Sequence, residues 1–225
     1  MEHEAGVLFS IGPLEVTGTV TTMWAIILVI SLVAYLSTRR LNEIPGPLQT
    51  AAEMALSSLE DFFAGTMGRV NAKKYLPIFA TFFIFIIVSN YSGVLPGAGH
   101  VNGFSVPTAC LSVTAALSVL AFFTTHIIGV KEVGWKTYLR SFIKPFILLL
   151  PLNLIEQLIR PFSLALRLYG NLYGEEMVTS QLYNVFPILL PLIMNALSLI
   201  FCLIQAKVFT MLLSIYVTEG IESGH

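Results

Sequence analysis

Three basic side chains stand inside long apolar stretches of this sequence, namely Arg160, Arg167 and Lys207. A charge at membrane depth costs about 2.5–3.5 kcal/mol on insertion scales, so such residues usually face a protein interior or a water-filled path. Arg167 is the most informative of them, because no Asp or Glu lies three or four residues away to neutralise it. A neutralising carboxylate must therefore come from another helix or another chain, and we expect Arg167 to be functional.

Polar side chains accompany these cations at helical spacing. At about 100° per residue, one face of a helix over 142–183, bent near its prolines, carries four of them: Glu156, Arg160, Arg167 and Asn171. Glu176 follows Arg167 by nine residues, which is half a turn around the helix and about 13 Å along its axis. The arginine and this acid then meet different surroundings, one a partner surface and the other a polar access path.

Structural roles compete with these functional ones. Arg160 follows Glu156 by four residues, a spacing that also suits an ion pair within one helix. Glu175 is either a second acid of the access path or a solvated side chain. On the last apolar run, Ser198 and Gln205 share a face, where they either line a polar path or form hydrogen bonds between helices.

The composition indicates a membrane protein. Of the 225 residues, 56% are hydrophobic and only 11% are charged, whereas about a quarter of the residues in a soluble domain are charged. The 12 basic and 13 acidic residues nearly balance, which argues against a nucleic-acid partner. Both cysteines lie inside apolar runs, so the sequence predicts no disulfide framework, no metal site and no cofactor.

The apolar runs predict an all-α polytopic membrane protein with about five membrane helices, all in a single membrane domain over 1–225. A membrane helix needs about 20 mostly apolar residues. This test divides the chain into an outer N-terminal segment, a first membrane helix, an amphipathic surface helix, two further membrane helices and a long tilted hairpin: 1–19, 20–38, 47–68, 75–92, 106–128 and 142–217.

The basic residues predict the orientation. Apart from the three named above, every Lys and Arg falls on one side of the membrane if the N-terminus is outside. The outer segments over 1–19 and 93–105 contain neither residue type. The positive-inside rule then places the C-terminus in the cytoplasm. The N-terminus has no basic residue before Arg39, so we expect the first apolar run to be a membrane span and not a signal peptide.

The segment from Ser163 to Glu176, S-L-A-L-R-L-Y-G-N-L-Y-G-E-E, closely resembles the signature of subunit a of F-type ATP synthases. That signature is S-L-x-x-R-L-[FY]-G-N, followed after four residues by an acid. Three further segments resemble parts of the same family in the same order: S-N-Y-S-G-V-L-P-G around Asn90, P-L-N-L-I-E ending at Glu156, and L-I-Q-A-K-V-F around Gln205. The resemblance covers the chain from about Val16 to its C-terminus.

The resemblance implies a role for each candidate residue. Arg167 would be the stator arginine that faces the rotor ring of c subunits. The half-channel open to the outside would be bordered by four residues: Asn90, Asn171, Glu176 and Gln205. Glu156 and Arg160 would lie near the cytoplasmic half-channel. The implied partners are the c ring, the subunit b peripheral stalk, the remaining ATP synthase subunits and membrane lipid, in a bacterial plasma (inner) membrane or, alternatively, a thylakoid membrane.

Two positions depart from the family pattern. Ser198 stands where some members have a His, so ion passage would rely on Glu176, on Glu175 and on water. Lys207 stands where an apolar or aromatic residue is usual, and we expect it either to pair with an acid such as Glu175 or Glu219 or to extend toward the membrane surface.

Ion conduction coupled to rotation is the function that these features predict. The sequence shows no nucleotide loop, nucleophile constellation or metal site, so we expect no catalysis by this chain alone. The conducted ion, proton or sodium, depends mainly on the rotor carboxylate. Two alternatives stay open: a secondary ion-coupled or proton-coupled transporter, which should work alone in liposomes, and a non-transporting scaffold, which should tolerate neutral residues at Arg167 and Glu176.

Overall fold

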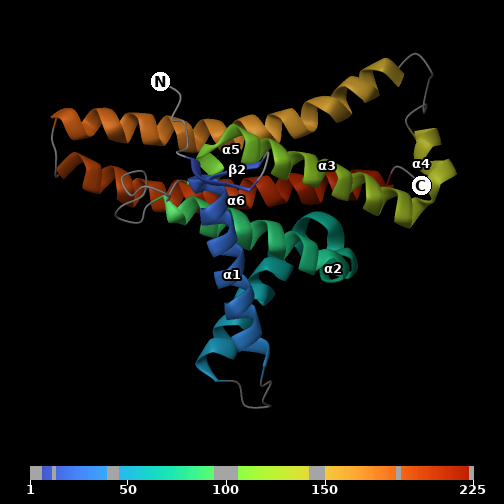
Figure 1. Cartoon of the computed structure of the whole chain (residues 1–225). Coiled ribbons are helices and arrows are strands. Elements are labelled where there is room, and N and C mark those ends of the chain that lie inside the picture. The colour runs from blue at the N-terminus through green and yellow to red at the C-terminus, as the bar shows by residue number, and fades with distance from the viewer. Residues whose placement is uncertain are drawn as a thin grey trace.

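The computed structural model describes residues 7–11, 14–39, 46–93, 106–141, 150–185 and 189–222 (Figure 1). Four helices or helix segments in this part of the chain are long and apolar enough to cross a membrane: α1 (Gly18–Thr38), α2 (Pro47–Ser92), α3 (Leu111–Val133) and Ile193–Glu222 within α6 (Leu189–Glu222). α5 (Leu150–Val185) is also long, but it carries charged residues such as Arg160, Arg167 and Glu176 along its length. The prediction of an all-α polytopic membrane protein is confirmed.

A short strand pair is the part of the fold that the sequence did not predict. β1 (Val7–Ile11) and β2 (Leu14–Thr17) pair antiparallel within the N-terminal segment, and β2 leads directly into α1. Strands of four and five residues carry too little alternation to stand out beside the strong helical runs.

α2 joins the predicted surface helix to the second membrane helix. Pro47 begins it at the first helical turn, where proline's missing N–H costs no hydrogen bond. The break falls at Gly68, whose φ of 77° is accessible to glycine without a Cβ clash. Phe63 and Phe79 then pack across the bend with ring centroids 5.0 Å apart. Residues 69–74, which the sequence left between two helices, are helical.

The third membrane helix is preceded by a separate turn and continues further than predicted. The 3-10 turn η1 (Pro107–Ala109) leads into α3, and α3 ends at Val133 before α4 (Trp135–Ser141). Gly129 permits α4 to fold back on α3, because a Cβ at this position would lie 2.5 Å from the ring of Tyr138. α3 therefore continues beyond 128, where the predicted membrane span ends, because glycine at 129 serves close packing and does not terminate the helix.

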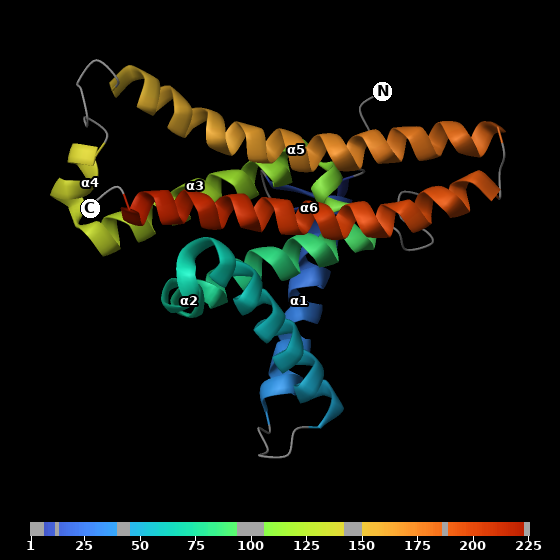
Figure 2. The same cartoon turned by 180° about the vertical axis from the view of Figure 1, so that it is seen from behind.

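α5 and α6 run side by side along most of their length, with α3 against both of them (Figures 1 and 2). α1 and the first half of α2 extend away from this layer in both views. The buried core lies where α2 and α3 pack against the two long helices, and its fully buried members include Phe79, Leu168, Phe209 and Leu213. The free faces of α5 and α6 remain rich in exposed Leu, Ile and Phe side chains.

Candidate functional site

A hydrogen bond between the two long helices marks the centre of the candidate site. Asn171 of α5 donates from Nδ2 to Oε1 of Gln205 of α6 over 2.6 Å. Gln205 is buried, with 5% of its surface exposed. The sequence placed these two amides in separate segments, and the fold brings them together because α5 and α6 are antiparallel neighbours.

Buried polar atoms continue from this pair toward α2. Asn90 is fully buried and donates from Nδ2 to the backbone oxygen of Cys202 at 3.5 Å. Among the described residues, Oδ1 of Asn90, Oγ of Ser89 and Nε2 of Gln205 have no hydrogen-bond partner. Such atoms are costly in an apolar interior unless water or an ion satisfies them. The region between α2 and α6 is therefore suited to a hydrated path.

Two buried hydroxyl groups escaped the sequence reasoning. Ser89 precedes Asn90 at the end of α2, and Thr108 lies in η1; each has a fully buried hydroxyl group without a hydrogen-bond partner in the described part of the chain. Their signal was a hydroxyl side chain at the end of an apolar run, beside Asn90 in one case and after Pro107 in the other. That signal is weak, because most serines and threonines in membrane helices bond to their own backbone.

The acidic residues of α5 are placed unequally. Glu175 is half-buried, so part of its side chain is covered by the protein and it is not a fully solvated residue. The side chain of Glu176 lies outside the described residues, although its backbone is helical. Ser198 is buried, but its hydroxyl donates to the backbone oxygen of Met194 in its own helix.

Arg167 lies on the exposed surface of α5, between residues that anchor this helix. Its neighbours Leu164, Ala165 and Leu168 are buried in the core. Leu166, by contrast, is 59% exposed, so the guanidinium emerges beside an apolar surface. No ion pair joins Arg167 to any carboxylate whose position the structure describes.

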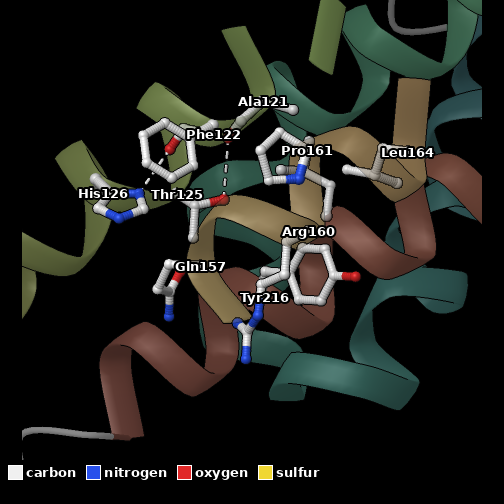
Figure 3. A pocket seen from close by; sticks show the side chains of 10 residues that line it. Ala121, Phe122, Thr125, His126, Gln157, Arg160, Pro161, Leu164 and Tyr216 are labelled. Atoms are coloured by element: carbon white, nitrogen blue, oxygen red, sulfur yellow. Dashed lines mark hydrogen bonds between the residues drawn. The ribbon is translucent and has the colours of Figure 1, made fainter. Parts of the chain in front are cut away.

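Arg160, in contrast, forms two ion pairs. One guanidinium nitrogen lies 2.7 Å from Glu156 and the other lies 2.6 Å from Glu219 of α6. Its guanidinium carbon also lies 4.6 Å from the ring centroid of Tyr216, as the close view shows (Figure 3). The ion pair between Glu156 and Arg160, which the spacing allowed, is thus present. The contact with Glu219 was not predicted.

Lys207 does not make the contact with Glu219 that was one expectation, since that carboxylate binds Arg160. Lys207 is exposed on α6 and forms no ion pair within the described ranges. Its long aliphatic stem allows the ammonium group to reach a polar boundary. Where the structure describes the chain, no three His, Cys, Asp or Glu residues cluster as metal ligands.

Comparison with known proteins agrees with the resemblance seen in the motifs. Residues 20–218 match the family model described as ATP synthase A chain. ATP synthase subunit a of Moorella thermoacetica is 39% identical over 221 residues, covering 97% of this chain and 96% of the relative. ATP synthase subunit a 1 of Syntrophotalea carbinolica is 40% identical over 210 residues, covering 92% and 86%. The chain is a multi-pass membrane protein that belongs to the ATP synthase subunit a family.

Proposed function

We propose that this chain is the ion-conducting stator subunit of an F-type ATP synthase, and that Arg167 is its charge-separating residue. The exposed position of Arg167, without an acidic partner among the described side chains, is the observation that carries this proposal. A permanent cation beside an apolar surface needs a carboxylate from another molecule. A rotor ring of c subunits, each with one acidic group at membrane depth, would supply such carboxylates in turn.

The buried polar atoms support an outer half-channel through Asn90, Gln205 and Asn171. Ser198, Glu175 and Glu176 would border it. Ions from outside would reach the rotor carboxylate along this path and neutralise it. The neutral carboxylic acid can then move into lipid, because its desolvation cost is much smaller than that of the ionised form. Glu156 would belong to the exit path on the cytoplasmic side.

Arg167 would act on each carboxylate that returns from the lipid. A guanidinium stays charged at any physiological pH and favours the ionised form of a nearby acid. The returning carboxylic acid therefore releases its proton toward the cytoplasmic path, and the same charge repels ions that would cross directly between the half-channels. The membrane potential supplies about 2.3 kcal/mol per charge per 100 mV for this cycle. ATP formation itself belongs to other subunits.

The proposed role of the chain also implies its partner contacts and its membrane. The free faces of α5 and α6 would contact the c ring. α1 and the first half of α2, which extend away from that layer, would offer contacts for the subunit b peripheral stalk and for lipid. We place the chain in a bacterial plasma (inner) membrane with the N-terminus outside and the C-terminus cytoplasmic, because the loops with Lys and Arg then lie inside.

ATP-driven ion pumping in vesicles that contain the complete complex tests this function. Arg167→Ala and Arg167→Lys should each abolish pumping, since the lysine keeps the charge but loses the planar, delocalised guanidinium. Arg140→Ala is the matched control, because Arg140 is an exposed arginine of α4 that lies outside α5 and α6 in the chain. Full pumping by the Arg167→Ala complex would refute the proposal. Running each assay with and without sodium identifies the ion.

A further inference from the structure

Arg167 can serve passing carboxylates only if α5 holds it at a fixed depth and orientation. Part of this rigidity comes from apolar packing, since Leu164 and Leu168 of α5 are buried in the core. Beside them a small hollow lies between α3, α5 and α6, lined by residues such as Thr125, His126, Gln157 and Leu164 (Figure 3). Polar contacts at the edge of such a hollow add to the relative fixation of the helices that apolar packing provides.

One guanidinium makes those contacts. Arg160 holds Glu156 of its own helix at 2.7 Å and Glu219 of α6 at 2.6 Å through different nitrogens, while Tyr216 lies under its cationic face. Only 16% of the Arg160 side chain is exposed, whereas half or more of each carboxylate side chain remains exposed. A planar guanidinium can satisfy two carboxylates and one aromatic ring together, and an ammonium group cannot reproduce this geometry.

The far end of this contact is itself immobilised. Glu219 precedes Gly220, whose Cα region packs closely against Gly129 of α3 and the buried ring of Tyr138 of α4. An added Cβ at Gly220 would lie 3.8 Å from the Cα atom of Gly129 and 3.9 Å from the ring of Tyr138, so α6 passes close to α3 and α4 here. Arg160 therefore ties α5 to a segment of α6 that two other helices flank.

Arg167 lies between two such ties. Arg160 precedes it by about 10 Å along the helix axis, and Asn171, which binds Gln205 over 2.6 Å, follows it by about 6 Å. Two attachment points on one side of a helix fix both its sliding register and its rotation, whereas a single point fixes neither. Arg167, which has no ion-pair partner among the described side chains, is thus flanked by two polar residues that have partners on α6.

From this arrangement we infer that Arg160 is a positioning residue, which clasps Glu219 to hold α5 in register with α6 and so presents Arg167 to the rotor. This inference rests on the proposed function of Arg167. It assigns Arg160 and Glu219 a role in the coupling of ion flow to rotation that neither the motif nor the proposed half-channels require.

Substitutions of Arg160 and Glu219 in the complete complex test this ion pair, which we call the clasp. The readout is ATP-driven pumping divided by ATP hydrolysis, normalised to the amount of assembled complex. Arg160→Gln and Glu219→Gln should each lower this ratio about tenfold, since misplacing a reacting group by 1 Å costs up to about 100-fold in rate. The double variant should be no worse than the poorer single variant, because both changes remove one contact.

The exchanged pair, Arg160→Glu with Glu219→Arg, should recover at least half of the original ratio. That chain again has one guanidinium between two carboxylates, because Glu156 stays beside position 160. Glu222→Gln and Lys136→Gln are controls, since both side chains are exposed and outside the clasp. Failure of the exchanged pair to recover assembly or coupling, or single variants that match the controls, would overturn the inference. Neither result would affect Arg167→Ala, so the two proposals fail separately.

Discussion

Asn171 and Gln205 are joined by a 2.6 Å hydrogen bond that crosses from α5 to α6, one helical turn beyond Arg167. The amide of Gln205 accepts this bond while its own Nε2 group has no partner in the described part of the chain. The pair therefore both connects the helices and leaves a donor free toward the buried polar region around Asn90.

Gln205→Leu should disrupt both properties. The change removes the acceptor of the Asn171 amide and leaves a polar group facing an apolar one, which costs about 1–3 kcal/mol. We expect ATP-driven pumping in vesicles to fall well below the level of the unchanged complex. Gln181→Leu, an amide replacement on the exposed surface of α5, provides the matched control and should pump normally. Equal pumping by both variants would argue against a role for the pair.

Ser89→Ala should separate conduction from stability. The hydroxyl of Ser89 has no partner among the described residues, so its removal should leave the melting temperature of the purified complex unchanged or slightly higher. Ion entry should nevertheless slow, because one polar group of the hydrated path is lost. Passive proton flux through vesicles depleted of the catalytic sector measures this effect.

Ser92→Ala is the contrasting variant for that experiment. Ser92 is also buried, but its hydroxyl donates to the backbone oxygen of Ser89 at 2.6 Å. Its loss should cost about 1 kcal/mol of stability, the ordinary value for one hydrogen bond. A destabilised Ser89→Ala complex with normal flux would contradict the assignment of Ser89 to the ion path.

Glu175→Gln should reduce pumping, because the half-buried side chain of Glu175 is placed as expected of an acid that borders the proposed ion path. The amide keeps the size of the side chain but cannot accept and release a proton at physiological pH. Pumping measured at several outside pH values should fall at all of them. Glu53→Gln, on the exposed surface of α2, is the control. Equal pumping by the Glu175→Gln and Glu53→Gln complexes would show that Glu175 has no role in ion transfer.

Gly129→Ala should weaken the attachment of α4 to α3. The new methyl carbon would lie 2.5 Å from the Tyr138 ring, and over-packing of this kind typically costs about 1–3 kcal/mol. Thermal unfolding of the purified complex measures the loss. At Gly65, nothing lies within 4 Å of an added Cβ, so Gly65→Ala should be neutral or mildly stabilising. A smaller side chain in place of Tyr138 should restore part of the thermal stability that Gly129→Ala removes.

The sequence alone supported most of the helical architecture, because a membrane helix must be about 20 residues long and apolar along its whole length. The same periodicity placed Arg160 and Asn171 on one face of α5. It could not reveal Glu219 as a partner of Arg160, since helical spacing reports only neighbours on one helix. The burial of Thr108 was equally inaccessible, because it depends on contacts between distant segments. The strand pair before α1 is local, but its strands are too short for their alternation to stand out.

The solitary charge of Arg167 has a consequence for how the complex is built. A subunit released into the bilayer before its rotor would expose this guanidinium to lipid, where water defects and local thinning would have to solvate it. Such a subunit should be short-lived, and a ring already present would rescue it by offering carboxylates at once. Arg167, which we propose to separate the two ion paths, would then also impose an order of assembly on the complex.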